Sequence, residues 1–473
     1  MSPSVATAVC AAGILGLFWL ERDRVSLVSA SIWIPVTWIF LAGSRSVGQW
    51  LDLNTTPDSV DAVLDGSPTD RLVYSVLLAL GVAVVLKRRR VVAGLLRANT
   101  PVVLFFVYGA ASILWSAYPD VAFKRWTKAL GDFVMVLVVL SDADRVGAIK
   151  RLFARTAFLL IPVSILFIKY YPALGRSYSV FEGTAFYIGA ATTKNGLGMV
   201  SLLFGLGALW CLLADFRMCS GSAARRRHVI ADGTIFVMAV WLCFVTNSMT
   251  SLWCFGLGAT VVVATSFRKA AKSLAIVHVL VGAVILLPFL TLFIGLGADL
   301  AHSATGRNMT TLTDRTEIWR ATVSLSGNSL LGTGFDSFWL GTRLRAMWNL
   351  YWWHPNEAHN GYLEVFLNLG WLGVALLGIV IATGYRAVIA AVRRNLPESS
   401  LMIGLFAVGI VYNFTESAFF RMMTPTWIMF LLAITDLPRY AGTRSVARLD
   451  THLENGRVPT NYHVSHNEWN SHV

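Results

Sequence analysis

The chain alternates between long apolar runs and short polar segments along nearly its whole length. The runs cover approximately residues 5–20, 25–43, 71–86, 101–115, 126–141, 156–168, 192–214, 229–247, 249–266, 274–297, 359–385, 400–415 and 424–437. Most of them approach the roughly 20 residues that a helix needs to cross a bilayer. Because backbone groups in lipid must be hydrogen-bonded internally, the pattern predicts an all-α polytopic membrane protein with about 12–13 transmembrane helices.

The polar segments predict the orientation. The positive-inside rule assigns to the cytoplasm the short loops that carry basic clusters, at 87–90, 217–228 and 386–394. The long polar segment 298–357 then lies on the outer, periplasmic side, and loops of that length usually carry function or contain short helices. We therefore expect one transmembrane domain over 1–437 with this loop inside it, followed by a polar, disordered cytoplasmic tail over 438–473.

Composition agrees with this interpretation. Hydrophobic residues make up 56% of the chain and charged residues only 14%, whereas ordinary soluble domains carry about 25% charged residues. The net charge of +13 is explained by topology, because the basic clusters lie in short loops, so no nucleic-acid partner is expected. The five cysteines show no CxxC or Cys/His ligand spacing, which argues against a disulfide framework or structural zinc.

The segment 351–373 carries the strongest signal of a site. In a helix that starts at about Ala358, Asn360, Glu364 and Asn368 would be four residues apart and share one face, with His359 at its outer end. An ionisable residue inside a membrane segment is a functional-site hypothesis by default. The alternative for Glu364 is that the polar stripe only hydrogen-bonds neighbouring helices.

Cations collect on the predicted outer face. In the loop 298–357 we expect a helix from Asp314 with a capping box to Glu317, which carries Arg315; Arg307 precedes it, and Gly332 and Gly334 mark a tight turn. The other outer cations are Lys124, Arg125 and Lys194, at the mouths of helices. They are suited to holding phosphate, although contact with lipid headgroups explains Lys124 and Arg125 equally well.

These residue types favour one kind of chemistry. Arginine binds a diphosphate bidentately, and a histidine takes a proton from a sugar hydroxyl. No acidic cluster with metal spacing accompanies His359, so we expect neither a metal nor a cofactor. Asp142 and Asp144 have the spacing of a metal-binding Asp-x-Asp pair, but a helix-capping loop is the favoured interpretation.

A family resemblance lies in the same residues. His359 and Asn360, nine further residues, and then Gly370 and Gly373 resemble the signature of bacterial O-antigen ligases and of the related O-antigen and exopolysaccharide polymerases of the Wzy type. The resemblance continues upstream through 315–319 and 332–339. It implies a GT-C-like membrane fold in the bacterial inner membrane with a periplasmic active site.

The resemblance also implies an activity. The family takes a glycan from undecaprenyl diphosphate and passes it to a hydroxyl of another glycan or of lipid A core. His359 would be the base, and Arg315 would contact the diphosphate; Arg307, Lys194, Lys124, Arg125, Asn360 and Glu364 are further substrate-binding candidates. The segments 124–126 and 194–198 look more like the exopolysaccharide polymerases, so polymerase is favoured over ligase. Other polysaccharide assembly proteins are possible partners. A transporter or flippase of lipid-linked glycan is the alternative of another class, but it should show paired half repeats, and none is visible.

Overall fold

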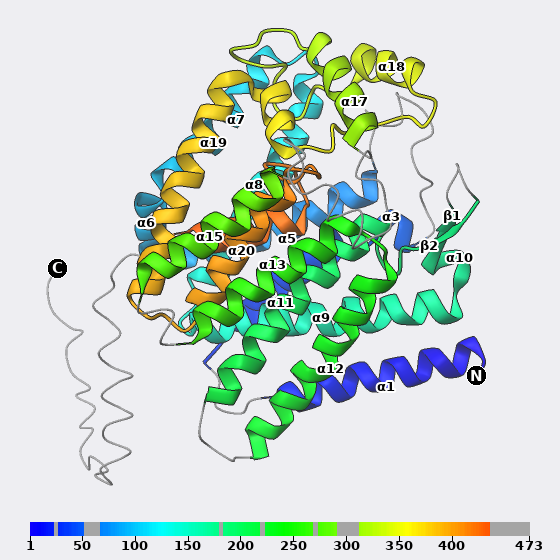
Figure 1. Ribbon diagram of the computed structural model, residues 1–473, viewed down its shortest axis with the longest axis vertical. Helices are drawn as coiled ribbons and strands as arrows, with labels where there is room; N and C mark the ends of the chain where they lie inside the picture. Colours follow the sequence, from blue (N-terminus) through cyan, green and yellow to red (C-terminus); the bar gives the residue numbers. More distant parts are fainter. Residues whose placement is uncertain are drawn as a thin grey trace, which may run out of the picture. The chain divides into compact units, whose positions relative to one another are not determined.

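A computed structural model describes residues 1–22, 27–51, 67–178, 183–217, 223–267, 273–290 and 312–435 (Figure 1). The predicted tail 438–473 and the first part of the predicted loop, including Arg307, lie outside these residues. The helices are α1 (Pro3–Glu21), α2 (Trp33–Ala42), α3 (Val47–Trp50), α5 (Pro68–Lys87), α6 (Arg89–Ala98), α7 (Thr100–Ala111), α8 (Pro119–Leu140), α9 (Arg145–Tyr170), α10 (Pro172–Gly175), α11 (Lys194–Arg217), α12 (Ala223–Val245), α13 (Met249–Ser266), α15 (Leu274–Phe289), α17 (Leu312–Ser324), α18 (Gly341–Leu350), α19 (Gly361–Arg393), α20 (Ser399–Tyr412) and α21 (Pro425–Ile434). Short 3-10 helices occupy Ala30–Ile32 and Ser112–Trp115, and two antiparallel strands, β1 (Arg176–Tyr178) and β2 (Ala185–Tyr187), pair Ser177 with Phe186.

Most of these helices have membrane character. Among the described residues, seven are long and apolar enough to cross a bilayer, namely α1, α5, α9, α11, α12, α13 and α19. The segment formed by α6 and by α7 with its 3-10 extension is bent by 89° and adds an eighth span if it is counted as one. Four apolar helices, α2, α15, α20 and α21, are shorter. The prediction of an all-α polytopic membrane protein is confirmed.

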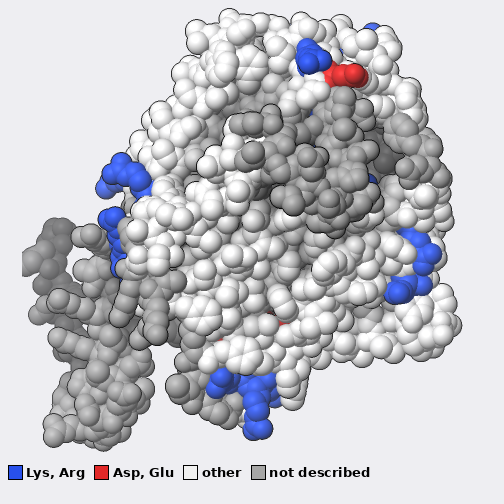
Figure 2. Space-filling model, viewed as in Figure 1, with Lys and Arg blue, Asp and Glu red and all other residues white. Residues whose placement is uncertain are grey.

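The face shown in Figure 2 has the surface expected of such helices. Lys, Arg, Asp and Glu occur there in small separate groups, with wide uncharged areas between them. Large apolar side chains such as Val237, Phe244 and Val279 are exposed. In lipid these side chains are in contact with hydrocarbon rather than water.

The helix α20 lies at the centre of the packing. Its residues from Ser400 to Tyr412 are all buried, which is typical of a helix that is apolar all round. It packs against α13, α21 and α19, and α11 in turn packs against α12 and α13 (Figure 1).

Two short helices, α17 and α18, lie together at one end of the bundle (Figure 1). They pack on an apolar cluster that also includes residues near the start of α19. Its buried members are Ile318, Phe338, Trp339, Leu344, Met347, Ala358 and Leu367. The segment predicted as the long outer loop therefore contains helices, and they rest on the helix that follows His359.

Several predicted helix starts need correction, including α9, which begins at Arg145 rather than near 156, and α12, which begins at Ala223 rather than near 229. The helix α19 begins at Gly361, not at Ala358, because the Asn360 side chain accepts hydrogen bonds from the N–H groups of Tyr362 and Leu363 and caps the helix. It also continues to Arg393 instead of ending near 385. The helix α17 starts at Leu312, before the predicted cap Asp314, and α8 starts at Pro119 rather than near 126.

The helix α19 bends at Gly370, whose φ of 64° and ψ of −168° are not helical. The bend frees backbone groups on both sides, and they pair with the segment 329–334. Four hydrogen bonds join the two segments: Thr333 N to Leu367 O (3.1 Å), Gly334 N to Asn368 O (2.9 Å), Trp371 N to Ser329 O (2.9 Å) and Leu372 N to Leu330 O (3.2 Å). Positive φ angles at Gly332 and Gly334 confirm the predicted glycine turn. The bend thus fixes the outer segment on the helix.

The helix-capping interpretation of the Asp-x-Asp pair is confirmed. The Asp144 side chain accepts from Gly147 N at 2.9 Å and caps α9, while Asp142 pairs with Arg88 at 3.0 Å. Cys10, Cys211, Cys243 and Cys254 are free thiols, and Cys219 lies outside the described residues.

Candidate active site

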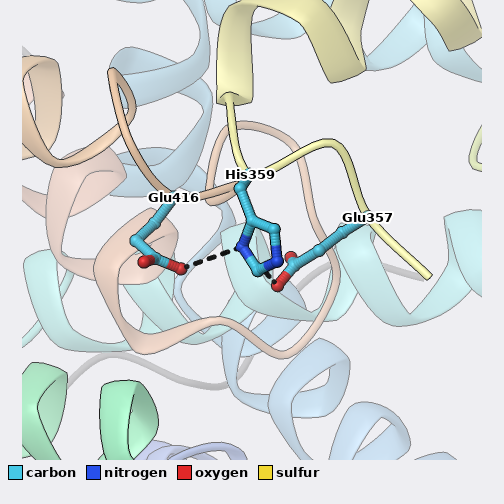
Figure 3. A group of neighbouring side chains, drawn as sticks. All are labelled: Glu357, His359 and Glu416. Carbon is cyan, nitrogen blue, oxygen red and sulfur yellow. Dashed lines mark ion pairs between the residues drawn. The ribbon is translucent and has the colours of Figure 1, made fainter. Parts of the chain in front are cut away.

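His359 lies between two carboxylates, just before the cap of α19 (Figure 3). Its φ of 51° is in the left-handed region, which turns the chain sharply before the helix begins. Its Nδ1 is 3.3 Å from Glu357 Oε1 and 3.5 Å from Glu416 Oε2. Nδ1 is buried, without hydrogen-bond geometry to either oxygen, whereas the whole side chain stays 24% exposed. The ring is therefore held from its Nδ1 side and remains partly open.

Each carboxylate has an arginine partner. Glu416, whose side chain is only 8% exposed, accepts from Asn195 Nδ2 at 2.9 Å and pairs with Arg315 Nη2 at 3.5 Å. Arg315 Nη1 also donates to the Thr415 carbonyl at 2.5 Å. Glu357 pairs with Arg421. The five side chains thus form a row, in which each carboxylate lies between an arginine and the imidazole of His359.

The loop 413–424 between α20 and α21 supplies Glu416 and Arg421. It is fixed at its start by Asn413 Oδ1, which accepts from Ala418 N (2.9 Å) and Phe419 N (2.8 Å). It is fixed at its end by Asp132, a fully buried residue of α8 that accepts from Met423 N at 3.0 Å and from Trp38 Nε1 at 2.7 Å.

The same loop is tied to α19 and holds strained backbone. Gly361 N donates to the Asn413 carbonyl at 2.9 Å, and Asn360 N donates to Ser417 Oγ at 3.2 Å. Phe420 and Met423 have positive φ angles of 54° and 56°, which non-glycine residues keep only when neighbouring contacts enforce them. The cap of α19 and the loop 413–424 therefore form one fixed unit around His359.

A cavity of about 660 Å³ opens beside this unit. Its charged and polar lining comes from four parts of the chain, and its apolar walls include several aromatic side chains. The lining includes Arg125, Asp336, Glu364, Asn368, Arg421, His354, Asn356, Trp339, Trp348, Phe335 and Phe420. Arg125 is held by Asp336, through the carbonyl at 2.7 Å and the carboxylate at 3.5 Å. Concave sites of this size with a few placed polar groups are typical of ligand-binding pockets.

Glu364 lies in the cavity wall, but its carboxylate already has several donors. It accepts from Trp339 Nε1 at 2.9 and 3.1 Å and from Ala358 N at 2.6 Å. Asn368 Nδ2 is 3.4 Å away, and Asn368 Oδ1 accepts from Ser337 N and Phe338 N. Glu364 and Asn368 thus share a face as predicted, and both fix the outer segment. Asn360 does not join them, because it is the helix cap.

The other predicted cations are dispersed. Lys124 is exposed on α8, outside the cavity lining that includes its neighbour Arg125. Lys194 is exposed at the start of α11, with its Nζ 5.9 Å from the centre of the Phe186 ring. The next residue, Asn195, is the one that reaches Glu416.

Sequence spacing missed the two carboxylates beside His359. Oxygen and nitrogen atoms of Glu357, His359 and Glu416 all lie within 4.8 Å of one another, an arrangement that can hold a metal ion. Arg315 and Arg421 offset the charges of the two carboxylates, however, and this favours an ion-pair network. The sequence feature that indicates a role for Glu416 and Arg421 is that both are charged and lie in a short segment between two apolar runs.

Comparison with known proteins gives the family. The sequence profile of the O-antigen ligase family matches residues 234–378. The chain is also similar to the exopolysaccharide production protein ExoQ of Rhizobium meliloti (strain 1021), with 25% identity over 346 residues that cover 70% of this chain and 74% of the relative. These matches confirm the resemblance to the O-antigen ligase and polymerase family. The chain is a multi-pass membrane protein whose residues 234–378 match the profile of the O-antigen ligase family.

Proposed function

We propose that this protein polymerises a glycan carried on undecaprenyl diphosphate, at the periplasmic face of the bacterial inner membrane. In the reaction, an acceptor hydroxyl gives its proton to His359 and its oxygen bonds to the anomeric carbon of the donor glycan. The bond from that carbon to the diphosphate breaks, and undecaprenyl diphosphate leaves with the bonding electrons. Arginines offset the charge that develops on the leaving diphosphate.

The placement of His359 carries the proposal. The negative charges of Glu357 and Glu416, whose oxygens lie 3.3 and 3.5 Å from Nδ1, favour the tautomer with its proton on Nδ1, which leaves Nε2 to accept a proton from a hydroxyl. The carboxylates also stabilise the imidazolium that forms. Glu416 is itself held by Arg315 and Asn195, so Arg315 acts as a positioning residue for His359. The step requires no metal and no cofactor.

The cavity supports a glycan substrate. The partly buried ring of Trp348 offers an apolar surface to a sugar ring, and the nearby arginines suit a diphosphate. The bias of Lys and Arg toward the loops 87–90 and 386–394 supports a periplasmic site, because α17, α18 and His359 then lie on the other side of the membrane.

The similarity to an exopolysaccharide production protein supports polymerase over ligase. ExoQ is named for exopolysaccharide production, and exopolysaccharide assembly joins glycan to glycan. The alternative, transfer to lipid A core, would use the same donor and the same base with a different acceptor. A flippase would need no base at a helix mouth, and the ordered network around His359 supports an enzyme.

The test uses purified protein with an undecaprenyl diphosphate-linked glycan and separate acceptors. We expect longer lipid-linked glycan with wild type, and a rate about 10²–10⁴-fold lower with His359→Ala, which removes the general base. His354→Ala should cost much less, because His354 stacks on Trp348 in the cavity wall, away from Glu416. Near-normal product from His359→Ala would refute the role of His359. Product only with lipid A core would establish the ligase instead.

A further inference from the structure

We propose that Arg421 binds the diphosphate of the lipid-linked donor and links it, through Glu357, to His359. This inference rests on the proposed function and assigns a residue outside the family domain at 234–378. Three observations carry it: the place of Arg421 in the cavity, its pairing with Glu357, and the engagement of the other arginines.

Arg421 is the member of the charged row that reaches the cavity. Its side chain is 39% exposed and lines the cavity together with Arg125, while His359 and Arg315 do not line it. Its Nη1 pairs with Glu357 Oε2, and the other oxygen of the same carboxylate is 3.3 Å from His359 Nδ1. One carboxylate therefore separates the open guanidinium from the imidazole.

Arg315 in the charged row and Arg125 in the cavity lining are already engaged by the protein. Arg315 holds the Thr415 carbonyl and Glu416, and Arg125 holds the carbonyl and the carboxylate of Asp336. A guanidinium has five N–H donors in a planar fork that matches phosphate oxygens. Arg421 has one carboxylate partner among the described residues and faces the cavity, so it is the arginine best placed to offer that fork to a ligand.

The backbone around Arg421 supports a placed side chain rather than a mobile one. Phe420 and Met423 hold positive φ angles on either side of it, and the Met423 N–H is bound by the buried Asp132. Strain of this kind collects at functional sites, where the surrounding contacts over-determine the backbone.

Because Glu357 contacts both Arg421 and His359, donor binding at Arg421 affects His359. A donor diphosphate draws N–H donors of Arg421 toward itself, because both are charged and the bonds are bidentate. The charge of Glu357 is then offset less by Arg421, so its carboxylate interacts more strongly with a proton on His359 Nδ1. Donor binding at Arg421 and the environment of His359 are therefore coupled through Glu357.

The test measures binding apart from transfer. Full-length protein in detergent is titrated with undecaprenyl diphosphate, and with undecaprenyl monophosphate for comparison, by native mass spectrometry. Arg421→Gln should weaken binding of the diphosphate by about 10–100-fold, as expected for lost charge-assisted hydrogen bonds. Arg421→Lys should be intermediate, since it keeps the charge without the fork. The matched control is Arg345→Gln, at an exposed position on α18, and it should bind as wild type does.

Each outcome decides a separate point. Wild-type affinity in Arg421→Gln, or equal losses for diphosphate and monophosphate, would overturn the assignment. If Arg421→Gln does not fold, the Arg421→Lys variant decides by the same comparison. Binding that depends on Arg421 without any transfer by wild type would keep this inference and reject the proposed function. Transfer by wild type together with unchanged diphosphate binding in Arg421→Gln would keep the proposed function and reject the role of Arg421.

Discussion

The backbones of Gly370 and Leu330 are in direct contact, and a Cβ atom on Gly370 would stand 2.3 Å from the Leu330 carbonyl carbon. The same kind of contact occurs from the outer segment to the helix, where a Cβ atom on Gly332 would stand 2.4 Å from the Asn368 carbonyl carbon. Two glycines therefore let the outer segment and the bent helix approach without side chains between them. Gly332 and Gly370 therefore have a packing role, which is to bring the two backbones together.

Replacing Gly370 by alanine should destabilise the protein and reduce transfer. The residue has φ 64° and ψ −168°, a conformation that costs an alanine about 1–3 kcal/mol before any clash is counted. The matched control is Gly378→Ala in the same helix, where an added Cβ atom would meet no packing neighbour within 4 Å and alanine is the better helix former. Thermal unfolding in detergent and transfer rates should separate the two variants. Equal melting temperatures would contradict the role of the bend.

Arg315→Lys should stay clearly impaired. Lysine keeps the charge but cannot bind the Thr415 carbonyl and Glu416 with one planar fork. Because Arg315 acts through Glu416 on His359, we expect a roughly tenfold or larger loss in kcat with little change in donor affinity, equivalent to about 1.4 kcal/mol. The measurement is a kcat and KM comparison with the lipid-linked donor. A rise in KM alone would instead favour the diphosphate contact that the sequence predicted.

Glu364→Gln should lower stability more than substrate affinity. The amide oxygen of glutamine replaces one acceptor, while its NH₂ group faces the N–H donors of Trp339 and Ala358. Hydrogen bonds to charged groups contribute about 1.5–3 kcal/mol, so the melting temperature should fall. An unchanged melting temperature with a raised KM would restore the substrate-binding role predicted from the sequence.

Transfer should be insensitive to chelators. The charges of Glu357 and Glu416 are offset by Arg421 and Arg315, so the cluster does not need a cation. Activity measured before and after dialysis against EDTA should agree within error. Loss of activity on chelation and recovery with one divalent metal would show that the cluster holds that metal and would contradict the proposed mechanism.

Cysteine labelling tests the predicted orientation. In a chain whose native cysteines are replaced by serine, a membrane-impermeant maleimide applied to the outer face should react with Ser324→Cys on α17 and not with Ala224→Cys on α12. Both positions are exposed in the fold. The opposite labelling pattern would place His359 in the cytoplasm and reject the proposed donor.

The fold was predictable because hydropathy and loop charge act locally. Each apolar run needs only its own sequence to form a helix in lipid, so the helices were expected without knowledge of their neighbours. Helix ends were less predictable. The start of α19 depends on the Asn360 cap, and His359 just before it adopts a left-handed φ that its position in an apolar-run pattern does not indicate.

Site residues could be predicted from the sequence only where they lie in one continuous segment. His359, Arg315 and the glycine turn come from the stretch 312–373, and their spacing gave useful hypotheses. Glu416 and Arg421 come from a loop more than 50 residues later, and Asn195 from α11, so their contacts with this stretch follow from helix packing alone. The spacing of residues within one segment does not indicate which distant helices pack against it.

The buried Asp132 has a consequence for biogenesis. It shares α8 with Lys124, Arg125 and Lys128, and a charged residue near the middle of a helix costs about 2.5–3.5 kcal/mol in insertion. As an isolated segment, α8 is therefore a weak substrate for the insertion machinery. One carboxylate oxygen of Asp132 accepts a hydrogen bond from the Trp38 indole on α2. The other oxygen accepts from the N–H of Met423, which is synthesised almost 300 residues later. During synthesis, Asp132 lacks this second donor until Met423 has been made, so the loop that carries Arg421 also completes the hydrogen bonding of a buried acid in α8.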